Sequence, residues 1–157
     1  MFPLFFTYRE VVNGAGFIAG VQIRGLALMA HENNDWVMTG VQPGCFTEVG
    51  DTFEEARLHF RGMFRGILFD IAEETADYDA FEAQVRKILG QVNEPAMAIW
   101  KQAVENKIEL KGEVEELERR FAGLGFELQV DRFNKPEVST ADSNQSDEYY
   151  VAEAEAA

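Results

Sequence analysis

The stretch that decides the fold is GVQPGCFTEVGDTFEEA, residues 40–56, which follows an apolar segment and leads into a long helical pattern. Pro43 and Gly44 mark a chain reversal, and a further glycine precedes the helical pattern. Thr52 is followed three residues later by Glu55, which is the spacing of a capping box at the start of a helix. The stretch therefore predicts a strand, a loop, a short extended piece, a tight turn and then a helix.

The helix that opens at Thr52 is predicted to cover a sheet with one apolar face. Apolar side chains recur at three- and four-residue steps, as in a helix with a single buried side. They are Phe53, Ala56, Phe60, Met63, Phe64, Ile67, Leu68 and Ile71. Gly62 and Gly66 interrupt this helix, although each costs about 1 kcal/mol relative to alanine in a helix interior. Close packing of the helix on the sheet, or a helix–helix contact between two copies, would explain them.

Residues 4–42, before this helix, have the pattern of strands. The first strand ends at the turn formed by residues 13–16, and the second occupies residues 16–30. Polar residues 32–35 then separate it from a third strand, residues 36–41. Short polar or glycine-containing turns between such segments are typical of hairpins. Three consecutive strands joined in this way predict an antiparallel three-stranded sheet.

The second half of the chain is predicted to hold two more helices and one returning strand. The second helix carries Phe81, Val85, Ile88, Leu89 and Val92 on one side, and the third, opening at Asn93, carries Met97, Ile99, Trp100, Ala103 and Val104. Apolar residues from Leu110 to Leu124 have the spacing of a coiled-coil seam, which we attribute to packing within the fold. Phe126, Leu128 and Val130 alternate with polar residues as a last strand.

The sequence thus predicts an α+β protein: an N-terminal antiparallel three-stranded sheet covered by an amphipathic helix, with a C-terminal helical extension and a last strand. The 157 residues, 46% of them hydrophobic, suffice for one ordinary domain with a real core. Residues 1–75 form the α/β core and residues 76–135 the helical extension. Residues 136–157 form an acidic tail, predicted to be disordered because it has few large apolar groups to bury.

Charge limits the partners that the protein can bind. Asp and Glu number 28 against 14 Lys and Arg, so the formal net charge is -14. Such a surface repels phosphate backbones and anionic membranes and attracts basic partners, so DNA binding is doubtful and membrane association is not expected. The single cysteine, Cys45, cannot form an intrachain disulfide, and the opening MFPLFF is too short for a signal or spanning segment. We therefore expect a cytoplasmic location.

Catalytic and metal-binding patterns are missing from the sequence. His31 and His59 do not form a ligand-spaced pair, and Cys45 is interpreted as a packed small residue in a loop. Acidic residues near the start of the first helix, among them Asp51 and Glu54, suit capping and the helix dipole. We therefore expect no enzyme activity, no metal and no cofactor.

Arg57, Arg61 and Arg65 are spaced four residues apart and form one row along the first helix. Such a row could follow a phosphate backbone or an acidic partner. The acidic neighbours Glu54 and Glu55 favour instead a solvated face on which the arginines form ion pairs.

The residues of the deciding stretch, led by the strand DWVMTG with Trp36, resemble the signature of the HicB-like antitoxin family. The matching positions are Pro43, Gly44, Cys45, Thr47, Gly50, Asp51, Thr52, Glu54, Glu55 and Ala56. The resemblance covers residues 21–74, about a third of the chain. It implies a small three-stranded sheet with helices on one face, akin to a partial ribonuclease H fold.

The resemblance also implies a function. Members of the family typically neutralise a small, basic, RNA-cleaving toxin, so we expect a non-enzymatic protein-binding role, which the acidic charge suits because opposite charges steer association. Candidate partner-binding residues are Trp36, Pro43, Gly44, Cys45, Asp51, Glu54, Glu55, Arg57, Arg61 and Arg65. A solitary HicB-like structural or regulatory protein without a toxin partner, and an RNA-binding or nuclease role, are the alternatives. A homo-oligomer is compatible with each.

Overall fold

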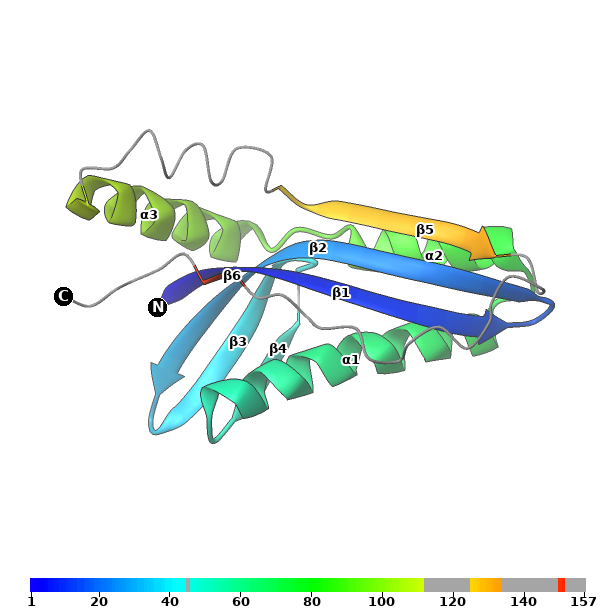
Figure 1. Cartoon of the computed structure of the whole chain (residues 1–157), viewed down its shortest axis with the longest axis horizontal. Coiled ribbons are helices and arrows are strands. Elements are labelled where there is room, and N and C mark those ends of the chain that lie inside the picture. The colour runs from blue at the N-terminus through cyan, green and yellow to red at the C-terminus, as the bar shows by residue number, and fades with distance from the viewer. Residues whose placement is uncertain (45, 112–124, 134–149, 152–157) are drawn as a thin grey trace.

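The structure, a computed structural model, describes residues 1–44, 46–111, 125–133 and 150–151 (Figure 1). The elements are β1 (Phe2–Gly14), β2 (Phe17–Glu32), β3 (Asp35–Gln42), β4 (Thr47–Gly50), α1 (Phe53–Glu74), α2 (Tyr78–Leu89), α3 (Glu94–Lys111), β5 (Glu127–Phe133) and β6 (Tyr150–Val151). The predicted α+β class is confirmed. None of the helices in the described ranges has the length and apolar character needed to cross a membrane.

The antiparallel β1–β2 hairpin forms the centre of the sheet, and its strands pair from Phe2 opposite Met29 to Gly14 opposite Phe17. Its two strands form a long ribbon, and the second strand has a different partner along each half of its outer edge (Figure 1). β2 pairs with β5 through residues 18–24 and with β3 through residues 26–32. Gly25 lies where the partner changes, beside a register shift.

The sheet is larger than the three-stranded meander that the sequence predicts. The β1–β2–β3 meander is confirmed, and β4 extends it as the short extended piece expected before the helix. The last strand of the helical extension is β5, which pairs with β2. Tyr150 and Val151 pair with Phe5 and Leu4 of β1, and so the segment predicted to be a disordered tail contributes β6. The other residues of 136–157 lie outside the described ranges.

Helices pack on both faces of the sheet, because successive strand side chains point to opposite faces. Leu4 and Phe6 of β1 belong to the main core with α1 and α2, where Phe60 and Phe81 are fully buried. Phe5, between them, belongs to a smaller cluster under α3 with Ala96, Met97 and Trp100. The long β1–β2 ribbon is therefore covered along one face and at one end of the other.

The capping box and the apolar face of α1 are confirmed. Thr52 Oγ1 accepts a hydrogen bond of 3.1 Å from the Glu55 backbone N–H. Glu55 Oε2 accepts one of 2.7 Å from the Asp51 backbone N–H, one residue before the cap. The predicted apolar residues of this helix are all buried or half-buried. The strand–loop–strand–turn–helix order of the deciding stretch is thus as predicted.

The later helices follow the sequence pattern with two exceptions. The first is Val92, which the sequence places on the second helix and which lies in the connection after α2 ends at Leu89. The Asp77 side chain accepts from the Ala80 backbone N–H at 2.8 Å, and the Asn93 side chain accepts from the Ala96 N–H at 3.1 Å, so both helices begin at a capping side chain. Ile99, which the sequence places on the apolar side of α3, is 43% exposed, and the prediction for it is wrong. The periodicity of α3 is weak, so its buried side is decided by the contacts around Phe5. Most of the predicted seam, residues 112–124, lies outside the described part.

Candidate interaction surfaces

The loop that carries the family-like motif joins the end of β3 to the connection between α2 and α3. The Gly44 backbone N–H donates to the Gln91 carbonyl at 2.6 Å, and the Asn93 N–H donates to the Val41 carbonyl at 2.9 Å. Pro43 and Gly44 are buried. A Cβ added at Gly44 would lie 2.3 Å from the Asn93 backbone nitrogen. The structure thus gives Pro43 and Gly44 an internal packing role, and their role in partner binding stays a prediction.

Trp36 connects the β2–β3 hairpin to the start of α1. Its ring stacks on His31 with a centroid distance of 4.7 Å and meets Phe53 edge-on at 5.6 Å. The indole is half-buried, and so only part of it is available to a partner. Cys45, the other candidate of this region, lies outside the described residues.

At the start of α1, Glu54 and Glu55 have partners through their carboxylates, and Asp51 has one through its backbone N–H. Asp51 and Glu55 take part in the helix cap described above. The Glu54 carboxylate pairs with Arg57 at 2.8 Å. Acidic groups in a first turn also interact favourably with the helix dipole, which is a sufficient structural reason for them.

The arginine row of α1 leans over the outer edge of β1. Arg65 Nε lies 3.5 Å from Glu10 Oε2, and the guanidinium carbon of Arg61 lies 5.7 Å from the centre of the Tyr8 ring. The Tyr8 hydroxyl donates to the same Glu10 oxygen at 2.9 Å. Burial, reinforced by this hydrogen bond and the charge of Glu10, raises the pKa of Tyr8 above its ordinary value. Arg61 and Arg65 thus make ring and ion-pair contacts within the chain. These contacts agree with the prediction from the sequence that the arginines form ion pairs on a solvated face.

The end of α1 and the start of α2 form an acidic surface that sequence reasoning missed. We call it the acidic elbow, and it consists of Asp70, Glu73, Glu74, Asp77 and Asp79, all exposed. None of the residues 66–85 is Lys or Arg. Within the described ranges, none of the five carboxylates forms an ion pair. The signal available in the sequence was this long interval without a basic residue.

The acidic elbow places negative charge where the helix itself disfavours it. The last turn of α1 contains Glu73 and Glu74 and no basic residue. A helix C-terminus carries a partial negative charge, so carboxylates there are unfavourable by a few tenths of a kcal/mol to about 1 kcal/mol each. A cationic group brought to this end would relieve that repulsion.

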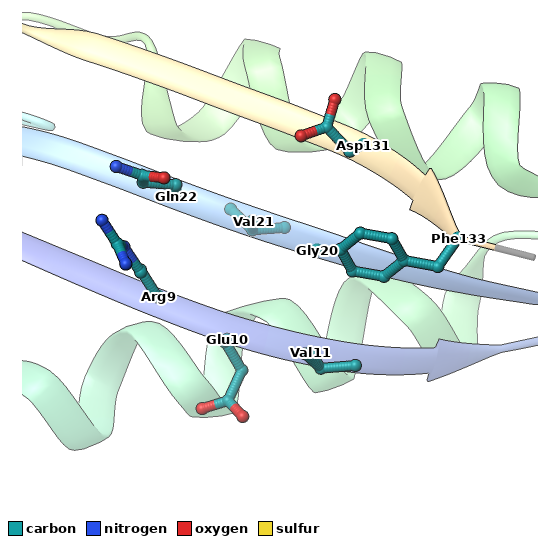
Figure 2. Close-up of a pocket in the computed structure, with 8 residues that line it drawn as sticks. All are labelled: Arg9, Glu10, Val11, Gly20, Val21, Gln22, Asp131 and Phe133. Carbon is teal, nitrogen blue, oxygen red and sulfur yellow. The ribbon is translucent and has the colours of Figure 1, made fainter. Parts of the chain in front are cut away.

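A shallow depression lies on the open face of the sheet between β1, β2 and β5 (Figure 2). Arg9, Gln22, Asp131 and Phe133 contribute to its lining, and the Phe133 ring lies over Gly20, where an added Cβ would be 2.5 Å from the ring. The lining contains no Ser, Cys, His or Lys. In the described part of the chain, no group of three or more His, Cys, Asp or Glu side chains is arranged to hold a metal ion.

No family model matches the chain, and no curated protein or solved structure matches it. The resemblance of residues 21–74 to HicB-like antitoxins therefore stays a prediction from the motif.

Proposed function

We propose that this protein is a non-enzymatic protein-binding module that resembles a HicB-like antitoxin and masks a small, basic, RNA-cleaving toxin. The observation that carries the proposal is the acidic elbow, whose exposed carboxylates have no cationic partner in the described residues. The net charge of -14 adds a long-range attraction for a basic protein.

A basic partner would be bound most favourably at the C-terminal end of α1, where the negative charges of the acidic elbow are unpaired within the described residues. Glu73 and Glu74 repel the helix terminus, and lysine or arginine side chains of a partner would neutralise both groups while contacting Asp79 on α2. Hydrogen bonds in which the donor and the acceptor are ionised are roughly twice as strong as neutral ones. Because the attraction is electrostatic, the complex should weaken as salt is added.

The proposal is tested by co-expression and binding measurements with a candidate partner. The gene neighbourhood is searched for a small Lys- and Arg-rich protein, any such protein is expressed alone and with this chain, and growth, RNA cleavage and complex formation are measured. We expect growth arrest by the small protein alone and rescue on co-expression, with a dissociation constant that rises with salt.

Paired variants locate the contact. Changing Glu74→Lys together with Asp79→Lys should weaken the complex at least about tenfold, which corresponds to 1.4 kcal/mol. The matched control changes Glu32→Lys with Asp35→Lys, since these exposed acids lie opposite each other at the β2–β3 turn. The control should bind like the wild type. Equal losses in both pairs would show that only net charge matters, and absence of rescue by the wild type would refute the antitoxin role.

A solitary HicB-like structural or regulatory protein is the second candidate. The observation that favours it is the internal use of the motif, because Gly44 and Asn93 lock the loop to the α2–α3 connection. This candidate predicts that no small basic neighbour is toxic and that none co-purifies. DNA binding at physiological salt is not expected from either candidate, because the acidic surface repels the phosphate backbone.

A further inference from the structure

The outer edge of β1 is protected in two different ways along its length. Within the described residues, β6 is the one strand that pairs with this edge, at Leu4 and Phe5 (Figure 1). On its other side β1 pairs with β2 through all 13 residues without a register shift, so no bulge turns the strand away. Such an edge offers unpaired N–H and C=O groups to other chains, and natural sheets protect it with charges, bulges or covering segments.

The half of β1 that follows Tyr8 is protected by charge. Arg9 and Glu10 lie in the strand itself, and Arg65 of α1 lies 3.5 Å from Glu10. The guanidinium group of Arg61 lies over the Tyr8 ring, beside the same edge. A strand that paired here would have to approach these charged groups, which opposes pairing between chains. This half of the edge therefore carries its own protection.

The half before Arg9 has no charged residue. Residues 2–8, FPLFFTY, are apolar apart from the hydroxyl groups of their last two members. The side chains of Leu4 and Phe5 are 0% and 1% exposed, because they pack on opposite faces of the sheet. Pro3 removes one N–H donor, and the residues after it retain theirs. Uncharged segments rich in apolar and aromatic residues pair readily between chains when their edge is open.

β6 lies on this uncharged half of the edge. Tyr150 pairs with Phe5 and Val151 pairs with Leu4, in antiparallel orientation. Because the side chains of both β1 residues are already buried, the new contact made by β6 is to the outward-facing backbone of the strand. β6 thus occupies hydrogen-bonding groups that a strand of another chain would otherwise use.

β6 itself makes a poor edge for another strand. It is two residues long and is flanked in the sequence by Glu148 and Glu153. Residues 136–157, to which it belongs, contain six acidic residues and no Lys or Arg. Short length and nearby charge are two of the ways in which natural sheets make an edge unsuitable for pairing. With β6 in place, the outermost strand at this position is short and has acidic neighbours.

We propose that β6 is an edge cover, which keeps the uncharged half of β1 from pairing with another chain and so prevents self-association of the protein. The two halves of one edge are then protected by different means, charge after Tyr8 and a covering strand before Arg9. The proposal does not depend on a toxin partner, so it can fail or hold independently of the proposed function. Loss of β6 should leave the core intact, because Leu4 packs in the main core and Phe5 packs under α3.

The decisive variant is the full chain with Tyr150→Pro and Val151→Pro. Consecutive residues of a strand direct their N–H groups to opposite edges, so one of the two prolines removes a donor to β1 in either case. Sedimentation velocity over a range of concentrations measures association. We expect the association constant of the variant to exceed that of the wild type at least about tenfold. The melting temperature of dilute protein should stay close to that of the wild type, which separates pairing through the edge from aggregation of unfolded chains.

The matched control places the same two prolines at Ala156 and Ala157, in the same tail but beyond β6, and should associate no more than the wild type. A rescue variant adds Thr7→Glu to the chain with the two prolines in β6. Arg24 lies opposite Thr7 on β2, so the new carboxylate has a cross-strand partner while it adds charge to the uncovered edge. Association should return to the wild-type level. A chain without β6 that associates no more than the wild type, or whose association persists with Thr7→Glu, would overturn the proposal.

Discussion

The hydroxyl of Tyr8 donates a 2.9 Å hydrogen bond to Oε2 of Glu10, two residues along the same strand, and Arg65 lies 3.5 Å from the same oxygen. Burial and the Glu10 carboxylate both disfavour the phenolate, so the pKa of Tyr8 is raised in the folded protein. In the unfolded chain the phenol titrates near its ordinary value of about 10. The neutral hydroxyl therefore contributes stability that is fully present below about pH 10 and is lost as the pH rises above it.

Tyr8→Phe should remove this pH dependence. Near neutral pH we expect a loss of roughly 1.5–3 kcal/mol, because a part-buried hydrogen bond to a charged group disappears. Above about pH 10 the stability of the wild type should fall more steeply than that of the variant. Urea unfolding of both proteins across this range measures the difference. Parallel decline of the two curves would contradict the role assigned to Tyr8.

Gly44→Ala should destabilise the fold, whereas Gly66→Ala should not. The new Cβ at position 44 would meet backbone atoms of Val92 and Asn93, which cannot rotate away, and overpacking typically costs about 1–3 kcal/mol. At Gly66 the space is open, and alanine should raise the free energy of unfolding by up to about 1 kcal/mol, because alanine favours a helix over glycine. Denaturant unfolding in dilute solution compares them. Similar effects at both sites would mean that the loop is not locked as described.

Phe60→Asp should abolish cooperative unfolding. The ring is fully buried against Phe6 and Phe64, and a charge placed there without a partner costs several kcal/mol. Leu58→Asp, two residues earlier on the exposed side, is the matched control and should change the stability of dilute protein by less than about 1 kcal/mol. Circular dichroism during thermal melting reports both. Unchanged melting of the Phe60 variant would show that the buried face is wrongly assigned.

Thr52→Ala should cost about 1 kcal/mol, because the Glu55 backbone N–H loses its acceptor at the first turn of α1. Thr47→Ala serves as the control, since Thr47 is exposed and its side chain makes only a long contact of 3.4 Å with Thr39. The two changes remove the same hydroxyl and methyl groups, so unfolding free energies can be compared directly. Equal losses would indicate that the cap contributes nothing beyond the side chain itself.

The features predicted correctly depend on interactions between residues close in sequence. Thr52 and Glu55 are three residues apart, and Phe60 and Phe64 are four apart, so their pattern reports the cap and the buried face of α1 directly. Asn33 and Asn34 have positive φ values in the turn between β2 and β3, where the polar run indicated a reversal. Such signals do not require knowledge of the rest of the fold.

The features missed depend on partners far away in the sequence. Alternation in Leu128 and Val130 predicts a strand but does not reveal that β2 would be its partner. Gly62 gives the same sequence signal whether it faces a sheet or solvent, and only the structure distinguishes the two. The internal role of Gly44 likewise depends on Asn93, which lies in a distant connection. The acidic elbow was overlooked because its carboxylates were included in the net charge of -14, and their clustering in residues 66–85, which contain no Lys or Arg, was not considered.

The division of β2 between two partners has a consequence for synthesis on the ribosome. β3 emerges directly after β2, so residues 26–32 can pair almost at once. Residues 18–24 must wait for β5, since Arg24 pairs with Glu127 and Ile18 with Phe133, about a hundred residues later. At roughly 5–20 residues per second, this half of β2 has an unpaired outer edge for several seconds or longer in each nascent chain. During that interval it is open to pairing with another chain, so the amount of protein that folds correctly should depend on how fast the ribosome translates the α1–α3 region.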